Sequence, residues 1–162
     1  MKKINIITLG CSKNTYDSEL LTGGLIKNKF KMVNDPVDAD FVIVNTCGFL
    51  DEARQESVEK ILEVEELKKN KVIDSLIVVG CMSERFGVEL RKELKHVDHY
   101  FGSDQSSEII EYLCSETHKR YDPDFTRLLS TPSHYAYLKI AEGCDNGCSF
   151  CSIPMMRGLQ KS

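Results

Sequence analysis

The chain has 162 residues, of which 41% are hydrophobic and 28% are charged, and its formal net charge is −4. This length accommodates one well-buried domain and a short part of a second. The acidic balance provides no basic field for nucleic acid, so direct nucleic-acid binding is not expected. The N-terminal apolar run is too short for a signal peptide, and no run approaches the about 20 residues that cross a bilayer. We therefore expect a cytoplasmic protein that makes no membrane contact.

Apolar runs and helical periodicities alternate along residues 1–114. The apolar runs are continuous, which is typical of parallel strands that are covered on both faces. Strands alternating with helices indicate βαβ units, so we predict an α/β domain with a flavodoxin-like parallel sheet. The predicted strands are 3–9, 40–46, 75–79 and 97–101, and the predicted helices are 17–30, 51–70, 84–94 and 105–113.

The remainder of the chain differs in composition. Residues 115–133 are polar and contain the steps Asp122-Pro123 and Thr131-Pro132, which is typical of a connector between domains. Residues 134–140 form a new apolar run that predicts a strand. Because one strand and a loop cannot bury a core, we interpret 134–162 as the incomplete start of a second domain.

Three cysteines each follow a predicted strand directly. Cys11, Cys47 and Cys81 are separated by steps of 36 and 34 residues, about one βα unit each. In a parallel sheet they share the carboxyl edge, where open α/β sheets bind ligands. This repetition predicts a metal site, although small buried thiols at crowded strand ends are the alternative. Cys114 lacks such neighbours and is interpreted as an ordinary thiol.

A second set of cysteines lies near the C-terminal end. Cys144, Cys148 and Cys151 have the spacing C-x3-C-x2-C, with Phe150 before the last. Clustered thiols in a reducing compartment indicate metal binding more than disulfides. Three thiolates can hold a four-iron cluster and leave one iron open to a ligand. A zinc site would need a fourth ligand, for which His134 is a candidate.

The spacing around Phe150 is similar to the radical S-adenosylmethionine (SAM) signature, and both cysteine sets together resemble the methylthiotransferase family. The resemblance implies an auxiliary [4Fe-4S] cluster on Cys11, Cys47 and Cys81, and a SAM-binding [4Fe-4S] cluster on the other three. It also implies an electron donor of flavodoxin or ferredoxin type and a sulfur donor. The segments that carry the resemblance are 8–14 with 17–19, 45–49 with 53 and 56–57, 79–81, and 139–158.

Short motifs favour one branch of this family. Gly10-Cys11-Ser12-Lys13-Asn14 and Cys47-Gly48-Phe49 resemble the branch that methylthiolates the β-carbon of an aspartate in a small-subunit ribosomal protein. The tRNA-modifying branch and a non-enzymatic Fe–S or zinc module remain alternatives. Because family members continue through a barrel and a small β domain, we expect these 162 residues alone not to turn over substrate.

Overall fold

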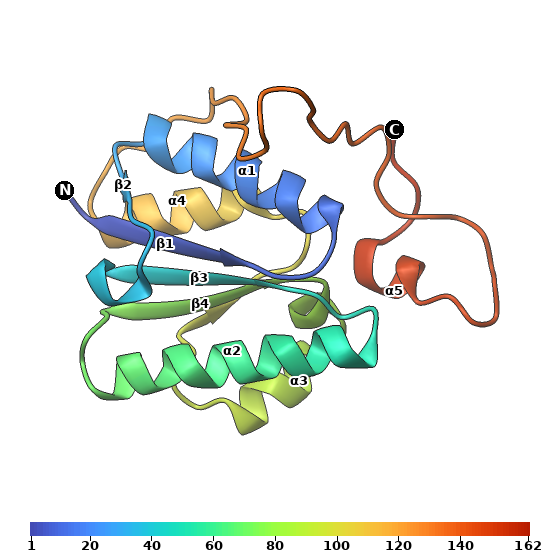
Figure 1. Ribbon diagram of the computed structural model, residues 1–162, viewed down its shortest axis with the longest axis horizontal. Coiled ribbons are helices and arrows are strands. Elements are labelled where there is room, and N and C mark those ends of the chain that lie inside the picture. Colours follow the sequence, from blue (N-terminus) through green and yellow to red (C-terminus); the bar gives the residue numbers. More distant parts are fainter.

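The computed structural model describes residues 1–162 and contains one parallel sheet of five strands (Figure 1). The strand order is β2-β1-β3-β4-β5, and every neighbouring pair is parallel. This is the flavodoxin-like order, so the predicted α/β fold is confirmed. The strands are β1 Lys3–Thr8, β2 Lys31–Met32, β3 Phe41–Thr46, β4 Ser75–Gly80 and β5 His99–Tyr100.

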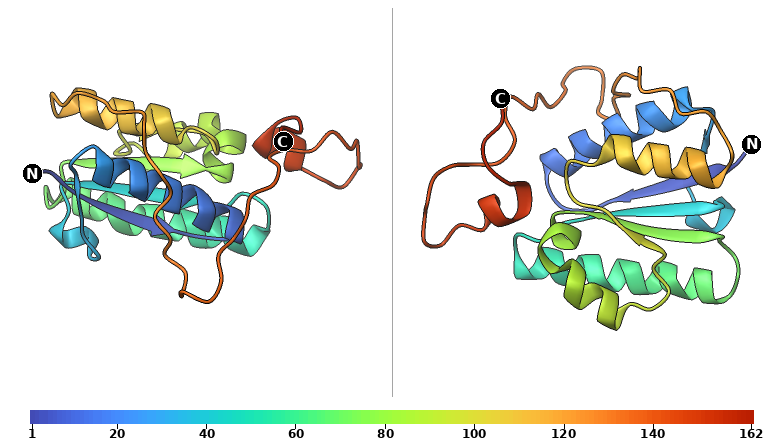
Figure 2. Two further views of the ribbon diagram at one scale, coloured as in Figure 1. Left: turned by 90° about the horizontal axis from the view of Figure 1, so that it is seen from above. Right: turned by 180° about the vertical axis from the view of Figure 1, so that it is seen from behind.

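Helices cover both faces of the sheet (Figures 1 and 2). The bounds are α1 Ser12–Lys27, the 3-10 turn η1 Pro36–Asp38, α2 Asp51–Lys69, α3 Cys81–Glu93, α4 Ser106–Glu116 and α5 Ile153–Arg157. Ile43 and Ile77 face α1 and α4, whereas Val44 and Val78 face α2 and α3. Because β3 and β4 are buried on both faces, every residue in them is excluded from solvent, as their continuous apolar runs predict.

The helices that follow the cysteines begin earlier than the periodicity predicts. Helix α1 begins at Ser12 rather than at residue 17, and α3 begins at Cys81 rather than at 84. Gly10 and Gly80 make these short strand-to-helix turns possible, because their φ angles of 88° and 98° are left-handed. Cys11 and Cys81 therefore lie at the N-termini of α1 and α3.

The predicted strand at 134–140 is wrong. A strand needs a neighbouring backbone with which to pair, and the only bridge in this part of the chain joins Glu142 to Lys161. Leu138 and Ile140 are 82% and 79% exposed. The short helix α5 was not predicted either, and it packs against α3 at the carboxyl edge of the sheet.

The connector 115–133 lies along α1 instead of standing free. The backbone N–H of Leu128 donates to the carbonyl of Glu19, and Ser130 donates through both its N–H and its hydroxyl to the Glu19 carboxylate. A Cβ on Gly23 would collide with the Thr126 carbonyl oxygen of the connector, and one on Gly24 would collide with the Ile110 side chain of α4 and touch the Phe125 ring, which explains two glycines inside a helix. The division into domains at 115–133 stays a prediction.

The longest helix, α2, is strongly charged, and none of the helices combines the length and the apolar character that crossing a membrane requires.

Candidate functional site

The three strand-end cysteines lie at one edge of the sheet. Cys11 precedes α1, Cys47 follows β3, and Cys81 is the first residue of α3. Cys47 and Cys81 are buried, whereas Cys11 is exposed. The predicted convergence at the carboxyl edge is therefore present, with one thiol open to solvent.

Two glycines allow the chain to come close at this edge. A Cβ on Gly10 would lie 2.5 Å from the Cys47 Cβ and 2.9 Å from its Sγ. A Cβ on Gly48 would lie 2.9 Å from the Met82 Cα and 3.0 Å from the Cys81 carbonyl carbon. Each cysteine loop therefore packs against the next one without space for a side chain.

Polar side chains fix the ends of the strands that carry the cysteines. Asn14 donates through Nδ2 to the carbonyl oxygens of Leu9 and Thr46, at 2.7 and 3.0 Å. The Cys47 N–H donates to the Ser57 hydroxyl at 3.1 Å, and that hydroxyl donates to the Ala53 carbonyl at 2.8 Å. These buried hydrogen bonds leave the two loops little freedom to move apart.

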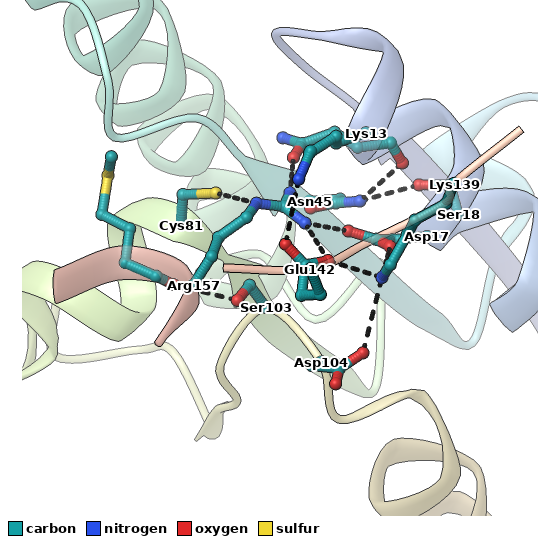
Figure 3. Close-up of polar contacts among 12 residues, drawn as sticks. Lys13, Asp17, Ser18, Asn45, Cys81, Ser103, Asp104, Lys139, Glu142 and Arg157 are labelled. Carbon is teal, nitrogen blue, oxygen red and sulfur yellow. Dashed lines mark hydrogen bonds and ion pairs between the residues drawn. The ribbon is translucent and has the colours of Figure 1, made fainter. Parts of the chain in front are cut away.

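Arg157 enters this edge from the C-terminal part of the chain (Figure 3). Its Nε donates to the Cys81 Sγ at 3.2 Å, and its Nη2 donates to the Asn14 Oδ1 at 2.8 Å. Its Nη1 donates to Asp17 at 3.0 Å and to Glu142 at 2.9 Å. The side chain is only 2% exposed, so all three guanidinium nitrogens are bound by protein groups inside the molecule.

Lys139 completes what we call the buried ion cluster, which consists of Asp17, Lys139, Glu142 and Arg157. The Lys139 Nζ lies 3.1 Å from Asp17 and 2.6 Å from Glu142, and the more exposed Lys13 contacts Glu142 at 3.3 Å. Two carboxylates thus balance the buried guanidinium and the largely buried Lys139, whose Nζ also lies 3.5 Å from the exposed Asp104. The cluster joins α1 to the segment 139–157, although Asp17 on α1 and Arg157 are 140 residues apart in the sequence.

The cluster changes the acidity of its members. Burial would raise the pKa of Glu142, but the hydrogen bond from Lys139 and the charge of Arg157 outweigh it and lower the pKa to about 2. For Asp17 burial dominates, and the pKa is raised despite Arg157 and Lys139. Burial opposes the charge of Arg157, yet Cys81, Asp17 and Glu142 raise its pKa, so the guanidinium stays charged.

Burial also raises the pKa of Cys81, and it outweighs the opposite effect of Arg157. The free thiol is therefore neutral near pH 7. A neutral thiol is a poor nucleophile, but a bound metal would deprotonate it outright. This environment suits a buried metal ligand better than a reactive cysteine.

The second cysteine set lies on a loop that projects beyond the sheet edge (Figure 2). Cys148 is exposed, while Cys144 and Cys151 are partly buried. The Cys144 N–H donates to the Gly158 carbonyl at 3.1 Å, and the Cys151 N–H donates to the Cys148 carbonyl at 3.1 Å. The loop therefore returns on itself and delivers α5 to the sheet edge.

No group of three or more His, Cys, Asp and Glu side chains is gathered so that it could hold a metal ion. A single zinc ion gathers its sulfurs at about 2.3 Å from the metal. An iron–sulfur cluster separates its ligand sulfurs more widely, and cysteine thiolates are its usual ligands. Two sets of three cysteines, one with a guanidinium donor beside a sulfur, fit that group by donor chemistry.

The other two candidate groups have different surroundings. Cys114 lies on α4 and is buried in the core, and its thiol lies 3.5 Å from the Asn28 Oδ1. It has the environment expected of an ordinary thiol. His134 packs its ring on Tyr135, with 5.2 Å between the centroids.

The sequence analysis missed the buried ion cluster. Lys139, Glu142 and Arg157 lie within the segment 139–158 that carries the family resemblance, and Asp17 lies in the first predicted helix. The only sequence signal for this cluster is that charged residues lie close to both sets of cysteines. Nothing in local periodicity shows that they pair across as many as 140 residues.

Comparison with known proteins bears on this arrangement. Residues 3–102 match the model of the family described as "Uncharacterized protein family UPF0004". The chain belongs to this family. It is also 48% identical over 160 residues to "Ribosomal protein uS12 methylthiotransferase RimO" of Christiangramia forsetii, covering 99% of the chain and 35% of that relative.

Other relatives with the same name agree. The chain is 49% identical to that of Flavobacterium psychrophilum and 45% identical to that of Myxococcus xanthus, covering 99% of the chain and 36% of each relative. The predicted resemblance to methylthiotransferases is confirmed. The chain spans about a third of the length of the curated relatives it matches.

Proposed function

We propose that this chain supplies the two iron–sulfur sites of a methylthiotransferase that modifies ribosomal protein uS12. The target is the β-carbon of an aspartate, where a C–H bond is replaced by C–S–CH3. The observation that supports this proposal most is the docking of α5, which follows the second cysteine loop, at the sheet edge of the first set, where Arg157 donates a hydrogen bond to Cys81. The names of the relatives support the substrate.

In this proposal Cys11, Cys47 and Cys81 hold an auxiliary [4Fe-4S] cluster. Cys144, Cys148 and Cys151 hold the cluster that binds S-adenosylmethionine. When bound, these groups supply radical cleavage of S-adenosylmethionine and the sulfur that enters the C–H bond. A one-electron donor of flavodoxin or ferredoxin type and a sulfur source are the partners that such chemistry requires.

The protein side chains contribute burial, orientation and access. Burial of Cys47 and Cys81 excludes water from two sides of the first site, whereas the exposed Cys11 leaves a side open. The hydrogen bonds of Asn14 hold two of the strand ends in register. An accessible side is what sulfur exchange and substrate approach both need.

The test uses the protein in its own cell. Deleting the gene should remove one CH2S unit from uS12, as measured by mass spectrometry of ribosomal proteins. The native gene should restore that mass, and a gene carrying C144A, C148A and C151A should not. Unchanged uS12 together with loss of a methylthio group from tRNA adenosine would contradict the proposal in favour of the tRNA-modifying branch.

A further inference from the structure

We propose that Arg157 is a positioning residue that couples the two cysteine sites. It donates a hydrogen bond to a sulfur of the first site, and it fixes the segment that carries the second. This inference rests on the proposed function of the cysteines. The juxtaposition itself consists of the hydrogen bonds of Arg157 to Cys81, Asn14, Asp17 and Glu142.

The contacts of Arg157 come from separate parts of the chain. Asn14 and Asp17 belong to α1, Cys81 begins α3, and Glu142 precedes the second cysteine loop. Arg157 itself ends α5, six residues after Cys151. One side chain thus connects the loop of the second site to two of the helices that begin at the first site.

The charges explain why this position needs an arginine. A buried guanidinium is costly unless its donors are satisfied, and here each nitrogen has an acceptor. The charges of Asp17 and Glu142 balance those of Arg157 and Lys139. Both carboxylates contact Nη1 of Arg157, so its Nε–H is free to donate to the sulfur of Cys81. Lysine could replace the charge but not the planar fork of donors.

The packing of α5 fixes the backbone from which the Arg157 side chain extends. Met156, next to Arg157, is 1% exposed, and its carbonyl oxygen accepts a hydrogen bond from the Ser103 hydroxyl at 3.0 Å. Since α5 also packs on α3, the backbone of Arg157 is held from two sides. The side chain therefore approaches Cys81 along a defined direction.

Two consequences follow for the two sites. Loss of Arg157 should loosen the segment 139–158, because Asp17 and Glu142 would then share only Lys139. It should also lower the reduction potential of a cluster on Cys81, because hydrogen bonds and positive charge at a ligand sulfur favour the reduced form. A residue that only fixed the segment would produce the first effect alone.

The first experiment uses the metal-free chain and hydrogen–deuterium exchange. In R157Q, exchange across 139–158 should accelerate at least tenfold, with R157K intermediate. The matched control is R120Q, which changes an exposed arginine and should leave the rates unchanged. Equal rates in R157Q and wild type would overturn the inference whatever the cysteines bind.

The second experiment removes the second site through C144A, C148A and C151A and reconstitutes the first with iron and sulfide. Added to this background, R157Q should shift the midpoint potential to a more negative value. S103A, which loosens α5 without changing charge, should shift it slightly positive or not at all, because added water favours the more charged reduced form.

An unchanged or more positive potential in R157Q would overturn the role toward the sulfur. R157K, which keeps the charge, should fall between R157Q and the wild type. Failure of the chain to take up iron would count against the proposed function. The exchange result on metal-free protein would still decide whether Arg157 fixes the loop.

Discussion

Gly10 lies directly against Cys47, so close that a Cβ on Gly10 would come within 2.5 Å of the Cys47 Cβ. The two residues follow adjacent parallel strands, β1 and β3. Their contact sets how closely two of the three cysteine-bearing strand ends approach. The spacing of this edge therefore depends on a residue that carries no side chain.

Replacing Gly10 with alanine should damage the first site. The φ of 88° is strained for alanine, which costs about 1–3 kcal/mol, and the new methyl group would displace Cys47. We expect a lower thermal midpoint and loss of iron at the first site after reconstitution. Gly147→Ala is the control, because nothing lies within 4 Å of its Cβ position. Full iron content in G10A would contradict this account of the edge.

The Glu19 carboxylate should make the packing of the connector on α1 sensitive to acid. Burial opposes its charge, but the hydrogen bonds from Ser130 and the charge of Arg127 outweigh burial and lower its pKa from the ordinary 4.5. The stabilisation is thus present above about pH 4.5 and is lost as the pH falls through the lowered value.

We expect proteolysis within 125–131 to increase below that pH in the wild type. E19Q, which has no charge to lose, should be cleaved faster at pH 7 and should change less with pH. Limited proteolysis across the pH range tests this. An identical pH profile in wild type and E19Q would contradict the assignment to Glu19.

Replacing Glu142 with glutamine should release the C-terminal segment while leaving the sheet intact. Breaking a buried pair costs about 3–5 kcal/mol, because the remaining charges keep fewer partners. We expect rapid proteolysis after residue 133 with an unchanged far-UV spectrum of the remainder. Glu89→Gln, at an exposed position on α3, is the control. Unfolding of the whole chain would contradict this prediction, because it would show that the cluster stabilises the sheet as well as the docking of the C-terminal segment.

The parts of the fold predicted correctly are those that local sequence determines. Continuous apolar runs such as 41–46 identify buried parallel strands, and the recurrence of Cys11, Cys47 and Cys81 after them identifies the sheet edge. The early start of α1 was missed because it depends on the left-handed Gly10. The acidic residues Asp17 and Glu19 resemble those of a first helical turn, yet they lie well inside the helix.

The errors concern contacts that are distant in sequence. The run 134–140 has strand composition, but composition supplies no neighbouring strand, and the structure forms none there. Arg157 contacts Cys81, Asp17 and Asn14, which lie 76 to 143 positions away, and no local pattern encodes these contacts. Both depend on how the C-terminal segment meets the sheet edge.

Iron and sulfide analysis of the anaerobically reconstituted chain tests the central claim most directly. Two four-iron clusters predict about eight irons per chain, and removing either set of three cysteines should leave about four. C114A, which alters a cysteine of the core, should keep the full content. Binding of zinc alone, or an iron content that stays at about eight per chain after loss of Cys11, Cys47 and Cys81, would contradict the account.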